Sequence, residues 1–316
     1  MRFGVVIPVK DDASRLARAL AGVAGQGPGI IIVVDDGSVD DSAATAERVL
    51  AGFDVEHLII RQPNRGPGAA RNQGARAAAG RVDAIAFIDA DCEPMPGWLD
   101  GLRAMIEQDR SQIVGGTIHP RPTNARIGRA VNGLCPVGHR RTSDDQIEYL
   151  VTANMAMPVC MFTRLGGFDE RADTATNEDT DLSIRARGAG IPLALARSAV
   201  VVHDDRTTAR GLWRAAIRSG RGSVRLSRSW RPVRQPPTEV VRHLAGILVA
   251  PWRGRSYPVV GAVVLMVNHV GFLFGLTTGL VLDRRIRHGP PRLLAAPDTG
   301  AMVGPCWCGR CFTITR

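Results

Sequence analysis

Several patterns that would assign this sequence to a common class are absent from it. No Gly-x-Gly-x-x-Gly or Gly-x-x-x-x-Gly-Lys-Ser/Thr follows the first apolar run, so dinucleotide-binding and P-loop interpretations lose their main support. The apolar run in residues 1–10 is too short for a secretory signal peptide, and we expect the N-terminal part to stay in the cytoplasm. The six cysteines do not suggest a secreted disulfide framework. Three of them, in a terminal Cys-Trp-Cys-Gly-Arg-Cys motif, leave a tetrahedral zinc site one ligand short.

Acidic residues are almost absent from the last third of the chain. Residues 206–316 contain 18 Arg or Lys and 3 Asp or Glu, a net charge of +15. Residues 1–205 contain 22 basic and 27 acidic residues, a net charge of −5. Such an asymmetry indicates a polyanionic partner for the basic part, either a membrane surface or a nucleic acid.

Short apolar runs alternate with helical patterns in the N-terminal part. We predict strands at 3–8, 30–34, 55–60 and 84–88, and helices at 13–24, 42–50 and 69–79. This alternation predicts an α/β fold, with a mainly parallel sheet covered by helices on both faces. Ligands of such sheets bind at the carboxyl ends of the strands.

Acidic residues follow two of these predicted strands. Asp35 and Asp36 end the second strand, and Asp89 and Asp91 follow the fourth. Side chains two positions apart in an extended chain point the same way, so Asp89 and Asp91 would repel each other unless a cation lies between them. A solvated loop is the simpler interpretation of a lone Asp-x-Asp. Arg71, early in a predicted helix, could offer its charge and nearby helix amides to a diphosphate.

Two later segments also carry polar groups with alternative interpretations. Glu178, Asp179 and Asp181 precede a helical pattern, where acids are favoured by the helix dipole even without a function. His203 ends an apolar run at 200–202, and a histidine in that position is more often structural than a ligand.

Six ordered motifs together resemble the family 2 inverting glycosyltransferases of the GT-A fold. The resemblance covers about residues 1–235 and rests on Val-Ile-Pro-Val at 6–9, Asp-Asp-Gly-Ser at 35–38, Gly-x-Gly-Ala-Ala-Arg-Asn at 66–72, Asp-Ala-Asp at 89–91, Gly-Gly-Phe-Asp-Glu at 166–170 and Glu-Asp-x-Asp-Leu at 178–182. The sequence departs from the family after the first strand, where Lys10 and Asp11 replace an aromatic residue and an asparagine.

The resemblance implies a nucleoside-diphosphate sugar donor, Mg²⁺ or Mn²⁺ as cofactor, and roles for the matching residues. The nucleotide-sugar site would comprise Pro8, Val9, Asp36, Arg71, Asp89, Ala90 and Asp91, and the metal ligands would be Asp91, Asp89 and His203. A cation and a diphosphate between Asp89 and Asp91 would remove their repulsion. Asp179 would be the base that deprotonates the acceptor hydroxyl, with Glu178 and Asp181 as orienting neighbours. A single displacement would invert the anomeric carbon.

The expected organisation is a GT-A glycosyltransferase domain at 1–205 followed by a basic, membrane-associated helical extension. The domain divides into a nucleotide-binding part, 1–118, and an acceptor part, 119–205. Nine arginines recur every three or four residues from 206 to 234, which predicts Arg-rich interfacial helices within 206–257. An apolar membrane segment at 258–283 and a basic, Cys-containing tail at 284–316 complete the chain.

We expect the apolar segment to enter the membrane and return, because arginines flank it on both sides. Both of its ends would then face the cytoplasm, and the enzyme would work at the cytoplasmic face of the cell membrane on a glycan or a lipid-linked cell-envelope acceptor. A helical hairpin within a protein core is the alternative for this segment.

Two other functions are compatible with parts of the sequence. A nucleotidyltransferase needs a similar sheet and metal, but it would leave Asp179 without a role as base. A nucleic-acid-binding module would use the arginines, yet only Trp213 and Trp230 lie near them for base stacking. We therefore expect no nucleic-acid partner.

Overall fold

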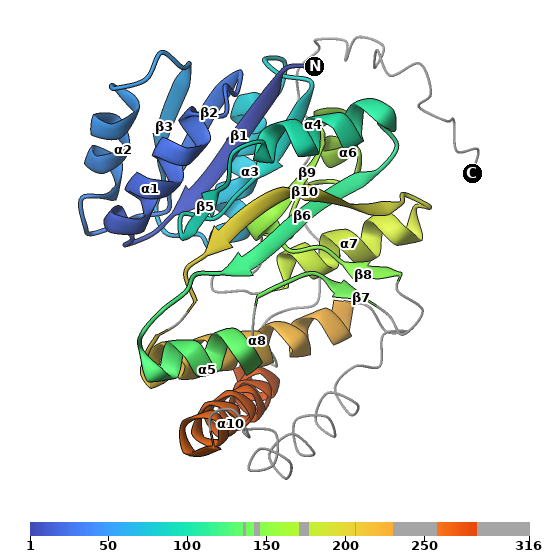
Figure 1. Cartoon of the computed structure of the whole chain (residues 1–316). Coiled ribbons are helices and arrows are strands. Elements are labelled where there is room, and N and C mark those ends of the chain that lie inside the picture. The colour runs from blue at the N-terminus through green and yellow to red at the C-terminus, as the bar shows by residue number, and fades with distance from the viewer. Residues whose placement is uncertain (135–136, 142–145, 171–176, 206, 230–257, 283–316) are drawn as a thin grey trace.

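The computed structural model describes residues 1–134, 137–141, 146–170, 177–205, 207–229 and 258–282. A mixed eight-stranded sheet, in the order β3-β2-β1-β4-β9-β6-β10-β5, forms the centre of this part (Figure 1). Its strands are β1 (Phe3–Val9), β2 (Ile30–Asp35), β3 (His57–Arg61), β4 (Ala84–Phe87), β5 (Cys92–Pro94), β6 (Ile113–Pro120), β9 (Met155–Pro158) and β10 (Leu193–His203). A separate two-stranded ribbon contains β7 (Arg140–Arg141) and β8 (Ile147–Tyr149).

Helices cover both faces of the sheet and continue beyond it. They are α1 (Ala13–Ala24), α2 (Ser42–Leu50), α3 (Pro67–Ala78), α4 (Trp98–Gln108), α5 (Arg126–Leu134), α6 (Val159–Arg164), α7 (Glu178–Gly188), α8 (Ala209–Ser229) and α10 (Pro258–Leu282). A short 3₁₀ helix, Thr152–Asn154, leads into β9. In Figure 1, α5, α8 and α10 lie together at one end of the molecule, outside the sheet and its covering helices.

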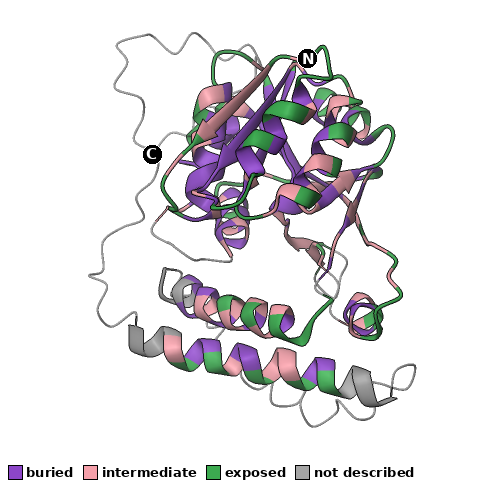
Figure 2. Ribbon diagram, turned by 90° about the vertical axis from the view of Figure 1, so that its left-hand side faces the viewer, coloured by how far each residue is buried: buried purple, intermediate pink, exposed green. Residues whose placement is uncertain are grey.

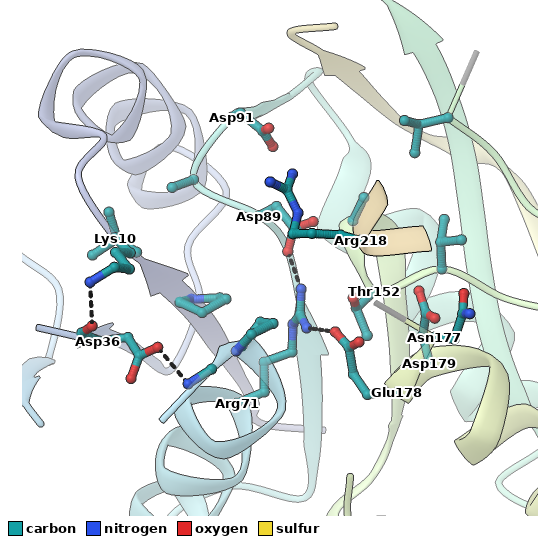
Figure 3. A pocket seen from close by; sticks show the side chains of 18 of the residues that line it. Lys10, Asp36, Arg71, Asp89, Asp91, Thr152, Asn177, Glu178, Asp179 and Arg218 are labelled. Carbon is teal, nitrogen blue, oxygen red and sulfur yellow. Dashed lines mark hydrogen bonds and ion pairs between the residues drawn. The ribbon is translucent and has the colours of Figure 1, made fainter. Parts of the chain in front are cut away.

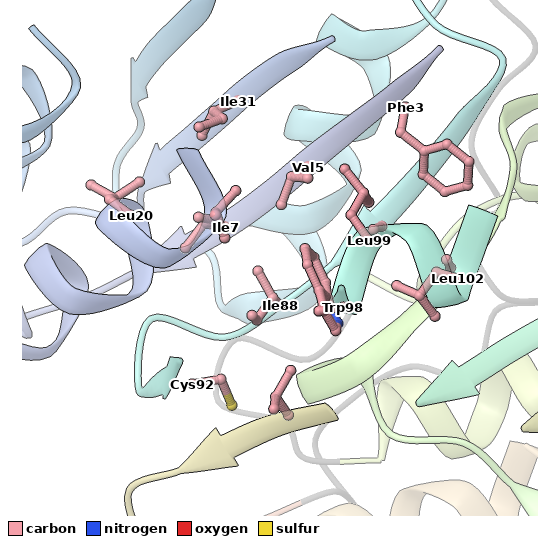
Figure 4. Packing of buried hydrophobic residues seen from close by; sticks show 14 of the residues in the cluster. Phe3, Val5, Ile7, Leu20, Ile31, Ile88, Cys92, Trp98, Leu99 and Leu102 are labelled. Carbon is pink, nitrogen blue, oxygen red and sulfur yellow. The ribbon is translucent and has the colours of Figure 1, made fainter. Parts of the chain in front are cut away.

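The alternation of side chains along the central strands produces two hydrophobic cores. Phe3, Val5 and Ile7 of β1 point to the face covered by α1, α2 and α4, where they contact residues such as Leu20 (Figure 4). Val6 points to the opposite face, which α3, α6 and α7 cover. These side chains are fully buried, and burial of each large apolar one stabilises the fold by roughly 1.5–3 kcal/mol.

One glycine brings α3 unusually close to the sheet. A Cβ atom at Gly74 would lie 2.4 Å from Cγ1 of Val6, so any other residue would push the helix away from β1. The preceding turn is formed by Gly66, whose φ of +88° also favours glycine. The N-terminal half of α3, which contains Arg71, is thereby held at the carboxyl ends of β1, β2 and β4.

The strands and helices predicted for residues 3–88 are confirmed, with ends shifted by at most two residues. The sheet is mixed because β9 is antiparallel to both β4 and β6. Its four residues lie between the two halves of the sheet and were not predicted, since a short apolar run after a 3₁₀ turn has no distinctive period. Strand β5, antiparallel to β10, is a second such case.

The helices beyond the sheet form a closely packed pair. A Cβ at Gly220 of α8 would lie 2.1 Å from the carbonyl oxygen of Phe272, and one at Gly275 of α10 would lie 2.2 Å from that of Ile217. The two helices therefore touch backbone to backbone. The apolar segment is one continuous helix, α10, and does not fold back on itself as a hairpin. No helix in the described part of the chain is long and apolar enough to span a bilayer. The segments predicted at 230–257 and at 284–316 lie outside the described residues.

Candidate active site

A cavity of about 700 Å³ opens where the carboxyl ends of β1, β2 and β4 meet the first turns of α3 and α7. Figure 3 shows acidic and basic side chains pointing into it from both walls. The predicted site residues that line it are Pro8, Val9, Asp36, Arg71, Asp89, Ala90, Asp91, Glu178, Asp179 and His203. Of the predicted set, the structure does not bring Asp181 to the cavity. This volume lies within the range usual for small-molecule sites.

Asp36 organises the loop that enters α3. Its Oδ1 accepts hydrogen bonds from Gln62 Nε2 and from the backbone amide of Arg65, both at 2.8 Å, and its Oδ2 accepts one from the amide of Gly66 at 2.8 Å. Lys10 Nζ donates to the carbonyl oxygen of Gly37 at 3.0 Å (Figure 3 shows the neighbouring bond to Asp36). The carboxylate of Asp36 is thus satisfied by the protein, and it fixes the shape of the wall beside Pro8 and Val9.

Arg71 joins the two walls of the cavity. Its Nη2 lies 2.6 Å from Asp89 Oδ1, and its Nη1 lies 2.5 Å from Glu178 Oε1. The side chain is only 5% exposed, so these ion pairs are shielded from water and the pKa of Arg71 is raised above its usual value by both acids. Its guanidinium carbon also lies 5.9 Å from the ring centre of Phe168. Arg71 lies beside the predicted nucleotide site, but its contact with a diphosphate remains a prediction.

Glu178 and Asp179 begin α7 on the opposite wall. Burial raises the pKa of Glu178 to about 7, although Arg71 opposes this shift, and the charge of Asp179 adds to it. Burial also raises the pKa of Asp179, whose Oδ1 accepts a hydrogen bond from the amide of Thr180 at 2.8 Å. Glu178, Asp179 and Asp89 all lie near the guanidinium of Arg71, so the protonation of one of these acids affects the pKa of the others. Their raised pKa values are typical of functional sites.

The other end of the cavity has a donor set that suits a divalent cation. Asp91 Oδ2 lies 3.6 Å from His203 Nε2, too far for a hydrogen bond but close enough for both atoms to bind one ion. Behind the imidazole, Nδ1 lies 3.0 Å from Oδ1 of the buried Asp205, a close contact without hydrogen-bond geometry.

Cys92 belongs to the same cluster, since its Sγ lies within 4.8 Å of the ligand atoms of Asp91 and His203. Burial in the hydrophobic core raises the pKa of this thiol well above its usual range, with a further contribution from Asp91. A protonated thiol is a poor metal ligand, so the residues that fit a cation are Asp91 and His203, with Asp89 beside them.

A sequence profile described as glycosyl transferase family 2 matches residues 4–168, which include β1 to β9 and the Asp89-Ala90-Asp91 segment. The chain belongs to this family. The resemblance stated from its motifs is therefore confirmed.

Named relatives agree with this membership. The pre-mycofactocin glycosyltransferase of Mycobacterium tuberculosis is 32% identical over 217 residues, which cover 65% of this chain and 43% of that one. The present chain thus matches less than half of the relative's length. Glycosyltransferase AglE of Haloferax volcanii is 25% identical over 233 residues, covering 70% of this chain and 73% of that protein.

Among solved structures, the mannosyltransferase PcManGT of Pyrobaculum calidifontis, in complex with GDP-Man and Mn²⁺, superimposes with a TM-score of 0.57 at 18% identity. The match covers 91% of this chain and 76% of the other. At this identity the likeness concerns the fold, and it confirms the predicted GT-A architecture.

Asp181 has a different environment from Glu178 and Asp179, the other two acids of its motif. Its Oδ2 lies 2.9 Å from Nε and 2.7 Å from Nη2 of Arg185, one turn along α7. Arg185 in turn donates to the carbonyl oxygens of Leu165 and Gly167. Asp181 therefore ties α7 to the turn after α6, and any influence on Asp179 is indirect.

The structure adds cavity residues that were not predicted as site residues. Thr152, Ala153 and Tyr149 line the wall next to Asp179, and Arg218 of α8 lines it from outside the sheet domain. The spacing of the arginines did predict one helical stripe, and Arg210, Arg214 and Arg218 are all exposed on α8. Periodicity alone cannot tell which surface such a stripe faces.

Proposed function

We propose that this chain transfers a sugar from a nucleoside-diphosphate sugar to an acceptor hydroxyl, with inversion at the anomeric carbon. The observation that carries the proposal is the arrangement of one cavity: a cation-binding pair, Asp91 and His203, lies at one end, and Asp179 lies on the opposite wall. An in-line displacement needs this separation, because the leaving diphosphate and the attacking hydroxyl lie on opposite sides of the sugar.

The donor would lie along the carboxyl ends of β1, β2 and β4. Pro8, Val9 and Asp36 would line the nucleoside pocket, while Asp89 and Ala90 would face the ribose and diphosphate. Asp36 acts through the loop that it holds, since its carboxylate already accepts three hydrogen bonds. PcManGT was solved with GDP-Man and Mn²⁺, which supports a donor of this class.

Asp91, His203 and Asp89 would hold Mn²⁺ or Mg²⁺. When bound, the ion would neutralise negative charge that develops on the leaving diphosphate. The imidazole of His203 favours Mn²⁺ over Mg²⁺, because Mg²⁺ is bound in proteins mainly through oxygen ligands.

Asp179 would accept the proton of the acceptor hydroxyl. Its raised pKa brings it closer to neutral pH than an ordinary aspartate, which strengthens it as a base while it is deprotonated. Glu178 would orient the site through Arg71, and Asp181 would do so through Arg185. This assignment distinguishes a glycosyltransferase from a nucleotidyltransferase, in which Asp179 would have no such role.

We expect the pH dependence of transfer to report on Glu178 and Asp179. The base must be deprotonated, so the rate should fall as the pH drops through the apparent pKa of the pair. Glu178→Gln removes the acid of the pair whose pKa is raised to about 7 and keeps a hydrogen-bond acceptor for Arg71, and it should move the acidic limb to lower pH. Turnover measured from pH 5.5 to 9 checks this. Glu170→Gln, a change outside the cavity, serves as control, and an unmoved limb in Glu178→Gln would contradict the coupling.

Nucleotide release from a panel of UDP-, GDP- and dTDP-sugars, with and without Mn²⁺, tests the proposed function. We expect metal-dependent release from at least one donor, increased when the acceptor is supplied. Absence of both binding and release with every donor, in a protein shown to be folded, would refute the proposal.

We further propose that the enzyme works at the cytoplasmic face of the cell membrane, on a glycan or lipid-linked acceptor. Support comes from an apolar stripe on α10, formed by Val263, Met266, Val270 and Phe274, which are 42% to 49% exposed and recur every three or four residues. The net charge of +15 in residues 206–316 would complement an anionic surface.

Binding to lipid vesicles examines this attachment. We expect the protein to sediment with phosphatidylglycerol vesicles more than with phosphatidylcholine vesicles, and to do so several-fold less after Val263→Ser and Val270→Ser are combined. Phe53→Ser, which removes an exposed apolar side chain from the sheet domain, is the matched control. Equal sedimentation of the double variant and the wild type would show that the apolar stripe does not contact lipid.

A further inference from the structure

Helix α8 is held in place from two sides. On one side it touches α10 at Gly220 and Gly275, where backbone meets backbone. On the other, Leu212 is buried in a cluster with Ala130 and Val131 of α5. Figure 2 shows α8 between α10 and the sheet domain. Packing against α10 and α5 therefore positions this helix beside the cavity.

Arg218 is the residue through which α8 reaches the cavity. Its side chain points towards Asp89 and Asp91 in Figure 3, and all three residues line the cavity. Arg214, one turn earlier on α8, is exposed and does not line the cavity. Arg221 turns towards α10 instead and donates from Nε to Thr278 Oγ1 at 3.1 Å.

The charge of the cavity indicates what Arg218 would bind. Asp89, Asp91, Glu178 and Asp179 all line it, and Arg71 is committed to two of these acids. A diphosphate would bring more negative charge to the same place. Stable binding needs cationic groups on the side of the diphosphate that faces away from the metal, in addition to the metal itself. An arginine offers a planar, bidentate donor for phosphate oxygens.

We propose that Arg218 is a positioning residue that binds the diphosphate of the donor and closes the cavity from α8. This inference rests on the proposed function, because it presupposes a nucleoside-diphosphate ligand. It extends the nucleotide site beyond residues 4–168, which the family profile matches, into helices that follow the sheet domain. Because the glycine contacts hold α8 against α10, α10 would then determine where Arg218 meets the diphosphate.

Calorimetric titration of the full chain with UDP, GDP and dTDP in the presence of Mn²⁺ tests Arg218. Arg218→Gln should weaken binding of the preferred nucleotide by about 10- to 100-fold, the range expected for one charge-assisted hydrogen-bonding partner. Arg218→Lys should recover part of this loss, because it keeps the charge without the bidentate fork. Binding of the corresponding nucleoside, which lacks phosphate, should not change. Arg214→Gln is the matched control.

A second variant tests the contribution of α10 to nucleotide binding without changing a residue that lines the cavity. Gly275→Ala would place a methyl group against the backbone of Ile217 and displace α8, so it should weaken nucleotide binding in the same direction. Combined with Arg218→Gln it should add little, because both changes remove the same contact. Gly188→Ala on α7, where a Cβ meets nothing within 4 Å, is the control.

Two results would overturn different claims. If the wild type binds nucleotide and Arg218→Gln weakens it no more than Arg214→Gln, Arg218 does not bind the diphosphate and the proposed function stands. If the wild type binds none of UDP, GDP and dTDP with Mn²⁺, the proposed function fails, and the role of Arg218 fails with it.

Discussion

Asp179→Asn is expected to reduce sugar transfer by about 100-fold or more while the affinity for donor stays near that of the wild type. An amide has the same shape as the carboxylate, so the hydrogen bond from the amide of Thr180 can be kept. It cannot accept the proton of the acceptor hydroxyl. Binding and turnover should therefore respond differently to this single change, which a structural defect would not produce.

Calorimetry with donor and Mn²⁺ measures the first quantity, and initial rates at saturating donor measure the second. Asp100→Asn is the appropriate comparison, because Asp100 is an exposed aspartate of α4 whose carboxylate binds Arg103 and does not line the cavity. Thermal unfolding of both variants detects any loss of fold. Transfer by Asp179→Asn within a few-fold of the wild type would mean that another group is the base.

Asp91→Ala should abolish the Mn²⁺-dependent part of donor binding. The substitution removes the carboxylate that faces His203 Nε2 at 3.6 Å, so a cation would keep only one strong ligand at this end of the cavity. Changes in groups that merely orient metal ligands cost 10- to 100-fold in affinity, and we expect the loss of a ligand itself to cost at least about 100-fold. Without metal, the diphosphate would meet the remaining acids unscreened.

The measurement is donor affinity with and without Mn²⁺ for the wild type and the variant. Glu93→Gln provides a nearby control, since the carboxylate of Glu93 binds Arg121 and does not line the cavity. The two affinities of Asp91→Ala should coincide. A variant that still binds donor more tightly in the presence of Mn²⁺, to the same degree as the wild type, would remove Asp91 from the metal site.

Much of the sheet domain could be predicted from local sequence because its elements follow from local patterns. Buried strands such as β2 are continuous apolar runs, and the helices between them begin and end at polar or glycine-rich turns. The carboxyl ends of parallel strands meet at one edge, so Asp36, Asp89 and Asp91 could be expected together from their positions just after predicted strands. Strand β9 could not be expected, since its place between β4 and β6 depends on long-range pairing.

The environment of individual site residues was harder to predict than their presence. Arg71 and Glu178 are 107 positions apart, and no local pattern indicates that they form a buried ion pair. The glycines of α10 lowered the apparent hydrophobicity of the segment, but Gly275 in fact permits contact with α8. Helical spacing identified the arginine stripe, whereas the position of Arg218 at the cavity depends on how that helix packs.

The ion pairs of Arg71 have a consequence for how the two substrates influence each other. One guanidinium contacts Asp89 at the proposed donor end and Glu178 beside the proposed base, so a ligand that changes its bond to one acid would also change the electrostatic field at the other. Linkage is reciprocal: if occupancy at the Asp89 end alters proton affinity beside Asp179, then the protonation state there must alter donor affinity by the same factor. The proposed donor and acceptor ends of the cavity would then not be energetically independent, because a single buried side chain contacts an acid at each of them.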